Sequence, residues 1–246
     1  MSQPVARRPS VPTVRAVFRA AGTDLYYQSL RLVPANVAWG AGFLGVLAVG
    51  LWLSPTLALV AAPLLALPFV GIIRLAAQIV RDEDVVLTDM TTAIRVYSMP
   101  ALLAGAITVA AGFVLVTNVI AGTAGGGPIG WAFATLAAWG LAALWIVGIA
   151  FWPLLVDPVR EATPLAARAR LAGLVVLANL IRFAILGVVL AAVTIISAVA
   201  FAALLSASVA FVSLIASRVT LPAADEIEAR LATAAPDGAT GASGRA

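Results

Sequence analysis

The distribution of charge along this chain constrains its fold more than any other feature. Long apolar stretches alternate with connectors, and the charged side chains lie in every second connector and at the two ends. All 15 cationic side chains are arginine. Because arginine beside a short loop of a membrane protein strongly favours the cytoplasmic side, this alternation predicts a polytopic membrane protein with both termini in the cytoplasm.

Composition agrees with a membrane location and excludes several kinds of site. Hydrophobic residues make up 63% of the chain and charged residues only 11%, which is far from the composition of a soluble globular domain. The chain has no cysteine and no histidine, so thiol nucleophiles, disulfides and the commonest metal ligands are missing. We therefore expect no catalytic residues, no cofactor and no metal. The arginines lack the polar surroundings of a nucleic-acid surface, and we expect them to contact membrane lipids instead.

Length and turn signals divide the apolar sequence into six predicted spans, since a span needs about 20 mostly apolar residues. No turn divides 171–217, but a single helix there would be about 70 Å long, so we expect two spans. The predicted fold is all-α, a bundle of six transmembrane helices in three hairpins, near 35–53, 56–74, 100–121, 129–155, 178–197 and 199–217. Residues 1–34 would form an amphipathic cytoplasmic segment, 35–218 the membrane domain, and 219–246 a partly disordered cytoplasmic tail. A short acidic helix is expected in this tail after Pro222.

A weak threefold repeat accompanies these spans. Each hairpin follows a polar or amphipathic segment and has a short uncharged outer turn. In the first segment, apolar residues between Val14 and Leu32 recur at helical spacing. Before the third hairpin, Thr163-Pro164 is typical of an N-cap and first helical residue. We expect these segments to lie flat at the inner interface or to pack beneath the bundle, the alternative being a chance pattern in cytoplasmic connectors.

Two arginines beside the spans are candidate functional residues. No aspartate or glutamate falls inside a predicted span, which disfavours a proton-coupled carrier and an intramembrane hydrolase. Arg74 lies at the inner end of the second span, where its long stem can reach the headgroups. Arg182 has the same position if the fifth span begins near Ala178. If that span begins at Leu171, Arg182 lies near mid-bilayer, where an anion or headgroup contact would be its role.

Prolines and asparagines supply the remaining candidates. Pro63 and Pro68 predict a kink or break in the second span, which suits either a broken-helix binding site or a simple packing bend. Asn118 near an outer end and Asn179 at an inner entrance are explained by capping or interface hydration, with a substrate contact as the alternative. Small residues at every fourth position over 198–210 predict close helix packing in the sixth span.

Three passages support a family resemblance. They are Asn36-Val37-Ala38-Trp39, the stretch Pro68-Phe69-Val70-Gly71-Ile72-Ile73-Arg74 with Val80-Arg81-Asp82-Glu83-Asp84-Val85, and Phe151-Trp152-Pro153-Leu154-Leu155-Val156-Asp157 with Leu177-Ala178-Asn179. In these passages the chain resembles the YesL-like family of bacterial membrane proteins, whose biochemical role is undefined. The resemblance covers about 30–220. It implies six spans in three hairpins and an association with carbohydrate uptake or utilisation systems, and it carries over no catalytic residue.

From these observations we expect a non-enzymatic accessory or scaffold protein of a bacterial inner membrane, beside a carbohydrate transport system. The alternative is a solute-translocating permease subunit that uses the proline break of the second span and Asn118. A third possibility is a lipid-modifying enzyme that holds a divalent ion with Asp82, Asp84 or Asp157. The sequence indicates neither a ligand nor an oligomeric state.

Overall fold

The computed structural model describes residues 13–200 and 207–234, and every regular element in those ranges is helical. The elements are α1 (Val14–Tyr27), α2 (Ser29–Ala48), a π-helical turn η1 (Val49–Leu53), α3 (Pro55–Ala61), a 3-10 turn η2 (Ala62–Leu65), α4 (Ala66–Val80), α5 (Leu87–Gly125), α6 (Gly127–Leu155), a second 3-10 turn η3 (Pro158–Arg160), α7 (Leu165–Ala178), α8 (Leu180–Val199) and α9 (Val209–Ala234).

Five helical stretches in the described ranges are long and apolar enough to cross a membrane. They are Ser29–Leu53, Pro55–Val80, Leu87–Gly125, Gly127–Leu155 and Leu180–Val199. These stretches coincide with the first five predicted spans, although several extend further at their charged ends. The chain is therefore an all-α integral membrane protein.

The remaining predicted span, 199–217, lies partly outside the described residues. Most of its described part, from Val209 on, belongs to α9, which continues without interruption past Pro222 into charged sequence. The acidic segment predicted to be helical after Pro222 is helical, but it is the C-terminal part of α9 and not a short helix of its own. A proline inside a helix loses one backbone hydrogen bond, and here tertiary packing on both sides maintains the helix.

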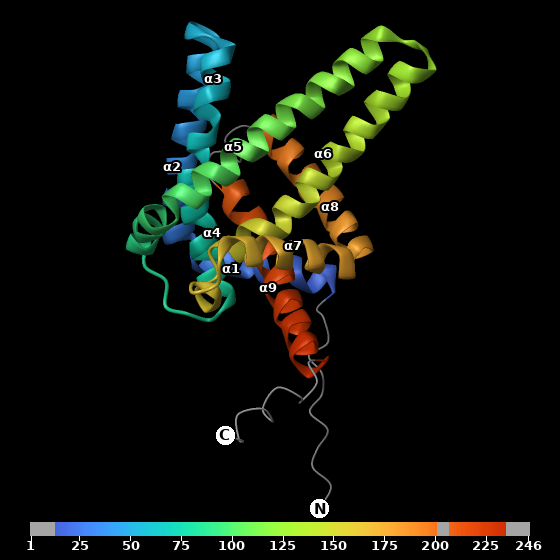
Figure 1. Ribbon diagram of the computed structural model, residues 1–246. Helices are drawn as coiled ribbons and strands as arrows, with labels where there is room; N and C mark the ends of the chain where they lie inside the picture. Colours follow the sequence, from blue (N-terminus) through green and yellow to red (C-terminus); the bar gives the residue numbers. More distant parts are fainter. Residues whose placement is uncertain (1–12, 201–206, 235–246) are drawn as a thin grey trace, which may run out of the picture.

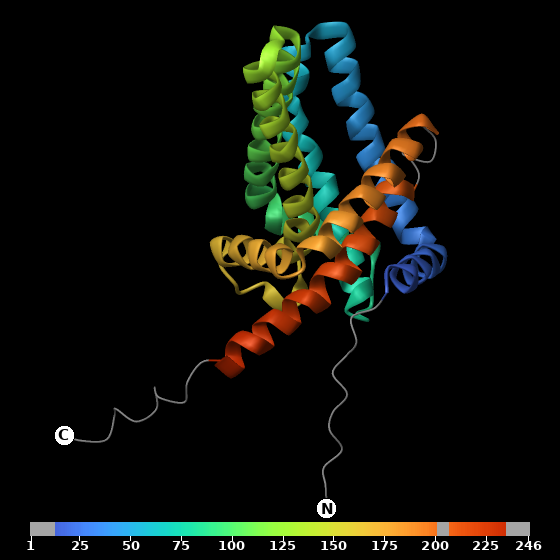
Figure 2. The same ribbon diagram turned by 90° about the vertical axis from the view of Figure 1, so that its right-hand side faces the viewer.

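α9 is the central helix of the described bundle. It packs against α1, α4, α6 and α7, and its residues between 208 and 224 are mostly buried. Small residues allow the neighbouring helices to approach this segment closely, among them Ala210, Ser213, Ala216, Ser217 and Thr220. Figure 2 shows α9 running obliquely from beside α8 to the side of the molecule that carries α7 and α1.

We call this side the polar end: it comprises α1, α7, the loop 81–86 and the charged half of α9. Figure 1 shows α1 and α7 lying across the direction of the long helices there. α1 buries Val17 and Ala21 against the bundle while Arg15 and Arg19 remain exposed, as its amphipathic pattern predicted. The segment before the second hairpin forms no separate helix, because it continues through Pro100 as the first turns of α5.

The start of α7 differs by one position from the sequence prediction. The helix begins at Leu165, so Pro164 occupies the cap position and no side chain caps the helix. Thr163 contributes through its backbone instead, because its carbonyl oxygen accepts a hydrogen bond from Arg168.

The turn between α5 and α6 requires glycine at two positions. Gly126 has φ 62°, in the left-handed region that favours glycine. Close to the turn, a Cβ on Gly122 would lie 2.6 Å from the carbonyl oxygen of Gly130, so no side chain fits there. The two helices can therefore pack against each other from the turn downward.

Candidate functional site

Two arginines and three carboxylates form a connected network at the polar end. Arg81 follows α4, Asp157 and Arg160 lie in the connector between α6 and α7, and Asp225 and Glu228 lie on α9. We call these five residues the polar-end network. It joins three parts of the chain that are far apart in sequence.

Arg81 connects all three parts. Its Nε and Nη2 donate to the two carboxylate oxygens of Asp157 at 3.2 and 2.7 Å. Its Nη1 and Nη2 donate to the oxygens of Asp225 at 2.6 and 3.1 Å. The planar guanidinium group suits two such paired contacts, which fix orientation as well as distance. The end of α4 is thereby held to the connector and to α9.

Arg160 makes a second bridge from the connector to α9. Its Nε and Nη2 donate to Glu228 at 3.2 and 2.6 Å, and Nη2 also donates to Asp225 at 2.7 Å. Its Nη1 donates to Asp157, whose carboxylate also accepts from the backbone N–H of Val159. The side chains of Asp157 and Arg160 are 0% and 3% exposed. Buried charges of this kind persist only when they are paired and hydrogen-bonded.

Pairing keeps these groups charged at neutral pH. Burial would raise the pKa of Asp225, but the hydrogen bonds from Arg81 and Arg160 outweigh it and lower the pKa below its ordinary value. The hydrogen bond to Asp225 raises the pKa of Arg81, with Asp157 adding to the effect against the opposition of burial. Burial opposes the charge of Arg160, yet its carboxylate partners raise that pKa too. These three groups are therefore structural charges and do not exchange protons near neutral pH.

Arg74 and Arg168 hold the connector from two further sides. Arg74 donates to the carbonyl oxygen of Val156 at 2.8 Å and pairs with Glu161 at 2.6 Å. The side chain that was expected to reach the headgroups is thus engaged within the protein, with 15% of it exposed. Arg168 donates to the carbonyl oxygens of Leu155, Glu161 and Thr163. These contacts satisfy backbone groups that the ends of helices leave without partners.

Arg182 and Asn179 lie where α7 meets α8. α8 begins at Leu180, so Arg182 is in its first turn, and Glu226 on α9 is near enough to interact with it electrostatically. This start matches the predicted position near the end of the span and not the mid-bilayer alternative. Asn179 donates from its Nδ2 to the carbonyl oxygen of Val175 at 3.2 Å, which caps the end of α7.

The two other asparagines differ sharply in environment. Asn118 is exposed on α5. Asn36 is fully buried, and its Oδ1 accepts from the backbone N–H of Ala210 at 2.9 Å. Asn36 therefore connects α2 to the start of α9, a structural role across helices that its position in the sequence did not indicate.

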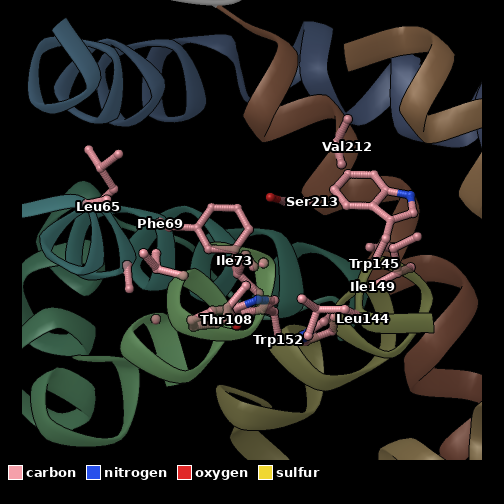
Figure 3. A pocket seen from close by; sticks show the side chains of 18 of the residues that line it. Leu65, Phe69, Ile73, Thr108, Leu144, Trp145, Ile149, Trp152, Val212 and Ser213 are labelled. Carbon is pink, nitrogen blue, oxygen red and sulfur yellow. The ribbon is translucent and has the colours of Figure 1, made fainter. Parts of the chain in front are cut away.

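An apolar cavity of about 470 Å³ lies between α2, α4, α5, α6 and α9. Aromatic side chains line it from three helices, and none of its lining residues is ionisable. Figure 3 shows Phe69, Trp145 and Trp152 around the space, with Ser213 of α9 on a further side. The cavity thus lies among helices that are apolar enough to cross a membrane.

The proline break forms one wall of this cavity. As predicted, the second span is interrupted: η2 separates α3 from α4, with Pro63 in η2 and Pro68 in the first turn of α4. Leu65 and Phe69, on either side of the junction, both line the cavity. Gly105 of α5 packs directly against the break, since a Cβ there would lie 3.1 Å from the Pro63 carbonyl oxygen. Of the sequence candidates, Pro63 and Pro68 thus flank the cavity wall, while Asn118 is not among its lining residues.

Sequence reasoning missed the polar-end network. It treated Arg81 as part of a solvated connector and Asp157 as a possible metal ligand. The carboxylate oxygens of Asp157 instead face two arginines, and among the described residues no acidic cluster could hold a metal ion. One local signal was available: Asp157-Pro158 directly after an apolar span is typical of a helix N-cap, which Asp157 provides for η3.

Comparison with known proteins adds no family. A scan against protein-family models, a search of curated proteins and a search of solved structures each found no match. The resemblance to the YesL-like family therefore stays an expectation from the sequence, and the geometry of the network and of the cavity supplies the functional argument.

Proposed function

We propose that this chain is a non-enzymatic membrane protein of a bacterial inner membrane that serves as an accessory or scaffold subunit of a transport system. Carbohydrate uptake is the class of transport that the sequence resemblance suggests. We further propose six spans in three hairpins, with the polar end and both termini in the cytoplasm. The observation that most supports a scaffold role is the polar-end network. Its buried charges pair with one another and so hold three parts of the chain together.

The network supports an exposed loop that suits partner recognition. Asp82, Glu83 and Asp84 are all exposed, and none forms an ion pair within the described part of the chain. Both ends of the loop are fixed, because Arg81 belongs to the network and Val85 is only 3% exposed. An acidic loop with fixed ends presents its charge in a defined place, which favours a partner with a basic surface.

Affinity purification tests the scaffold proposal. The tagged full-length chain would be extracted from its native host in mild detergent, beside a loop variant that carries Asp82→Asn, Glu83→Gln and Asp84→Asn. Glu226→Gln at the same end serves as the control. We expect identified transport subunits to accompany the wild type and the control, and to be lost from the loop variant, more strongly at high salt. Recovery of the chain alone under several extraction conditions would overturn the proposal.

The cavity beside the proline break supports a second candidate function, a permease subunit for a neutral solute. Broken membrane helices form binding sites because they free backbone groups beside a cavity. The test is uptake of glucose or glycerol into vesicles that contain the purified chain. Under this candidate, Pro68→Ala lowers uptake and Asn118→Ala does not, because Asn118 is not part of the cavity lining. Uptake no faster than in empty vesicles would exclude it.

A further inference from the structure

We propose that the apolar cavity binds one neutral lipid, with its chain inside the cavity and an uncharged, oxygen-bearing head. The site is the cavity invoked for the second candidate function, but the inference requires binding only and no transport. It is also independent of the scaffold proposal, which concerns the charged residues of the polar end.

The composition of the wall selects an uncharged, apolar ligand. Trp39, Phe69, Trp145 and Trp152 supply large apolar surfaces, and the lining offers no ionisable side chain to pair with a charge. Burial of an unpaired charge in such surroundings is strongly unfavourable. The volume of about 470 Å³ falls in the range of about 300–1,000 Å³ that is usual for small-molecule sites.

The surroundings of the cavity favour a ligand that comes from the bilayer. The lining residues belong to α9 and to four stretches that are apolar enough to span a membrane. Figure 1 shows the hairpin of α2 and α3 diverging from the hairpin of α5 and α6 away from the polar end. Such helices are surrounded by lipids, so a lipid chain is the molecule best placed to enter the cavity.

Two glycines show that the space is genuinely open. A Cβ on Gly112 of α5 would meet nothing within 4 Å, and one on Gly148 of α6 would meet only Trp152 Cδ1 at 4.0 Å. Gly105, on the same helix as Gly112, is by contrast packed, since a Cβ there would lie 2.9 Å from Ala66 Cβ. Protein interiors are close-packed, so an open apolar volume of this size favours an occupant. The open space lies in front of Gly112 and Gly148.

Two hydrogen-bond donors at the cavity without partners indicate that the ligand carries an acceptor oxygen. Most threonine hydroxyls in the spans donate to the carbonyl oxygen four residues earlier, as at Thr117, Thr123, Thr135 and Thr194. Thr108, an exposed residue that lines the cavity, has no hydrogen-bond partner among the described residues, and neither has the indole N–H of the half-buried Trp152. The indole N–H of Trp145 already donates to Gly187 at 3.0 Å. Free donors in an apolar wall favour a ligand with an acceptor oxygen, such as an ester or a hydroxyl.

Photo-crosslinking with a matched pair of probes tests this inference. The first probe is monopalmitoylglycerol with a diazirine in its chain, and the second is lysophosphatidylglycerol with the same labelled chain and an anionic head. The full-length protein in mild detergent would be irradiated with each probe, and the adducts would be mapped by mass spectrometry. We expect the neutral probe to label peptides that contain Phe69, Trp145 or Trp152. Unlabelled monopalmitoylglycerol should abolish this labelling, whereas lysophosphatidylglycerol should not.

Cavity-filling variants make the test specific. Gly112→Leu and Gly148→Leu place a side chain in the open space, so labelling by the neutral probe should fall to the level of the anionic probe. Gly45→Leu is the matched control: it lies on α2, its Cβ would also meet nothing within 4 Å, and it is not a lining residue. Its effect on helix propensity is the same.

The control separates specific binding from lipid around the protein. Labelling that is equal in Gly112→Leu, Gly148→Leu and Gly45→Leu would overturn the inference, and so would equal labelling by the two probes. Size-exclusion profiles identify any variant that fails to fold, and Thr108→Val then takes its place. It removes one donor and leaves the space open, so a smaller but measurable loss of labelling is expected. Co-purification of transport subunits is unaffected by these outcomes, so failure here leaves the scaffold proposal to its own test.

Discussion

Asp157 is the residue on which the polar end depends most. Its carboxylate is fully buried and accepts hydrogen bonds from Arg81 and Arg160, which come from different parts of the chain. Arg81 also pairs with Asp225, and Arg160 also pairs with Asp225 and Glu228. One buried anion thus organises two cations, and these in turn position α9.

Replacement of this anion should therefore destabilise the whole protein. In Asp157→Asn the shape is kept but both arginines lose a charged partner in a buried place, which typically costs about 3–5 kcal/mol of unfolding free energy. Denaturant or thermal unfolding in detergent measures the loss. The control is Arg230→Gln, which removes only the ion pair with Glu226; Arg230 is 71% exposed, and an exposed pair of this kind contributes about 0–1 kcal/mol. Equal losses in the two variants would contradict the central position of Asp157.

Asp225 should make the stability of the fold depend on pH in the acidic range. Its pKa is lowered in the folded protein, so its contribution to stability is fully present above the ordinary pKa of 3.8. The contribution is lost as the pH falls below that value and through the lowered pKa of the folded state. Unfolding midpoints measured between neutral and strongly acidic pH should drop in this window, and Asp225→Asn should flatten the drop. An unchanged acid profile in Asp225→Asn would show that other carboxylates set it.

At the scale of elements, sequence pattern predicted what depends on local chemistry. The positions of the first five apolar helical stretches, the turn around 122–130 and the proline break all follow from residues that are close in sequence, and the structure confirms them. The polar-end network could not be predicted in this way, because Arg81 pairs with residues 76 and 144 positions away. The extent of α9 was missed for the same reason: burial against α4, α1 and α6 keeps the helix intact past Pro222.

The contact between α5 and the proline break gives a prediction at this scale. Gly105→Ala places a Cβ 2.9 Å from Ala66 Cβ and 3.1 Å from the Pro63 carbonyl oxygen, so the two elements must move apart. Overpacking of this kind costs about 1–3 kcal/mol. Gly45→Ala adds the same methyl group to α2 where nothing lies within 4 Å, and the higher helix propensity of alanine should leave it neutral or slightly stabilising. Thermal unfolding of both variants checks the sign, and a Gly105→Ala protein as stable as Gly45→Ala would show that the break is loosely packed.

At the scale of the whole molecule, each polar or amphipathic segment precedes long apolar helices. α1 precedes α2 to α4, the first turns of α5 continue into α5 and α6, and α7 precedes α8 and α9. α1 and α7 lie at one end, where arginines join different parts of the chain, as Arg74 of α4 does by pairing with Glu161 before α7 (Figure 1). Arg218 of α9 extends this pattern to α1, since it pairs with Asp24 at 2.5 Å. The collection of charge at one end is thus a property of the folded molecule as well as of the sequence.

The proposed orientation can be tested by cysteine labelling. The chain has no natural cysteine, so only an introduced cysteine can react. In this orientation a bilayer would separate the polar end from the α5–α6 turn, with the arginine-rich side in the cytoplasm, the side that charge bias favours. In intact cells, a membrane-impermeant maleimide should therefore label Ala124→Cys at the turn and leave Glu83→Cys and Glu161→Cys unlabelled. After the membrane is permeabilised, all three should react, which shows that the silent positions are accessible. Labelling of position 83 or 161 from outside would reverse the orientation, and the acidic loop could then meet no cytoplasmic partner.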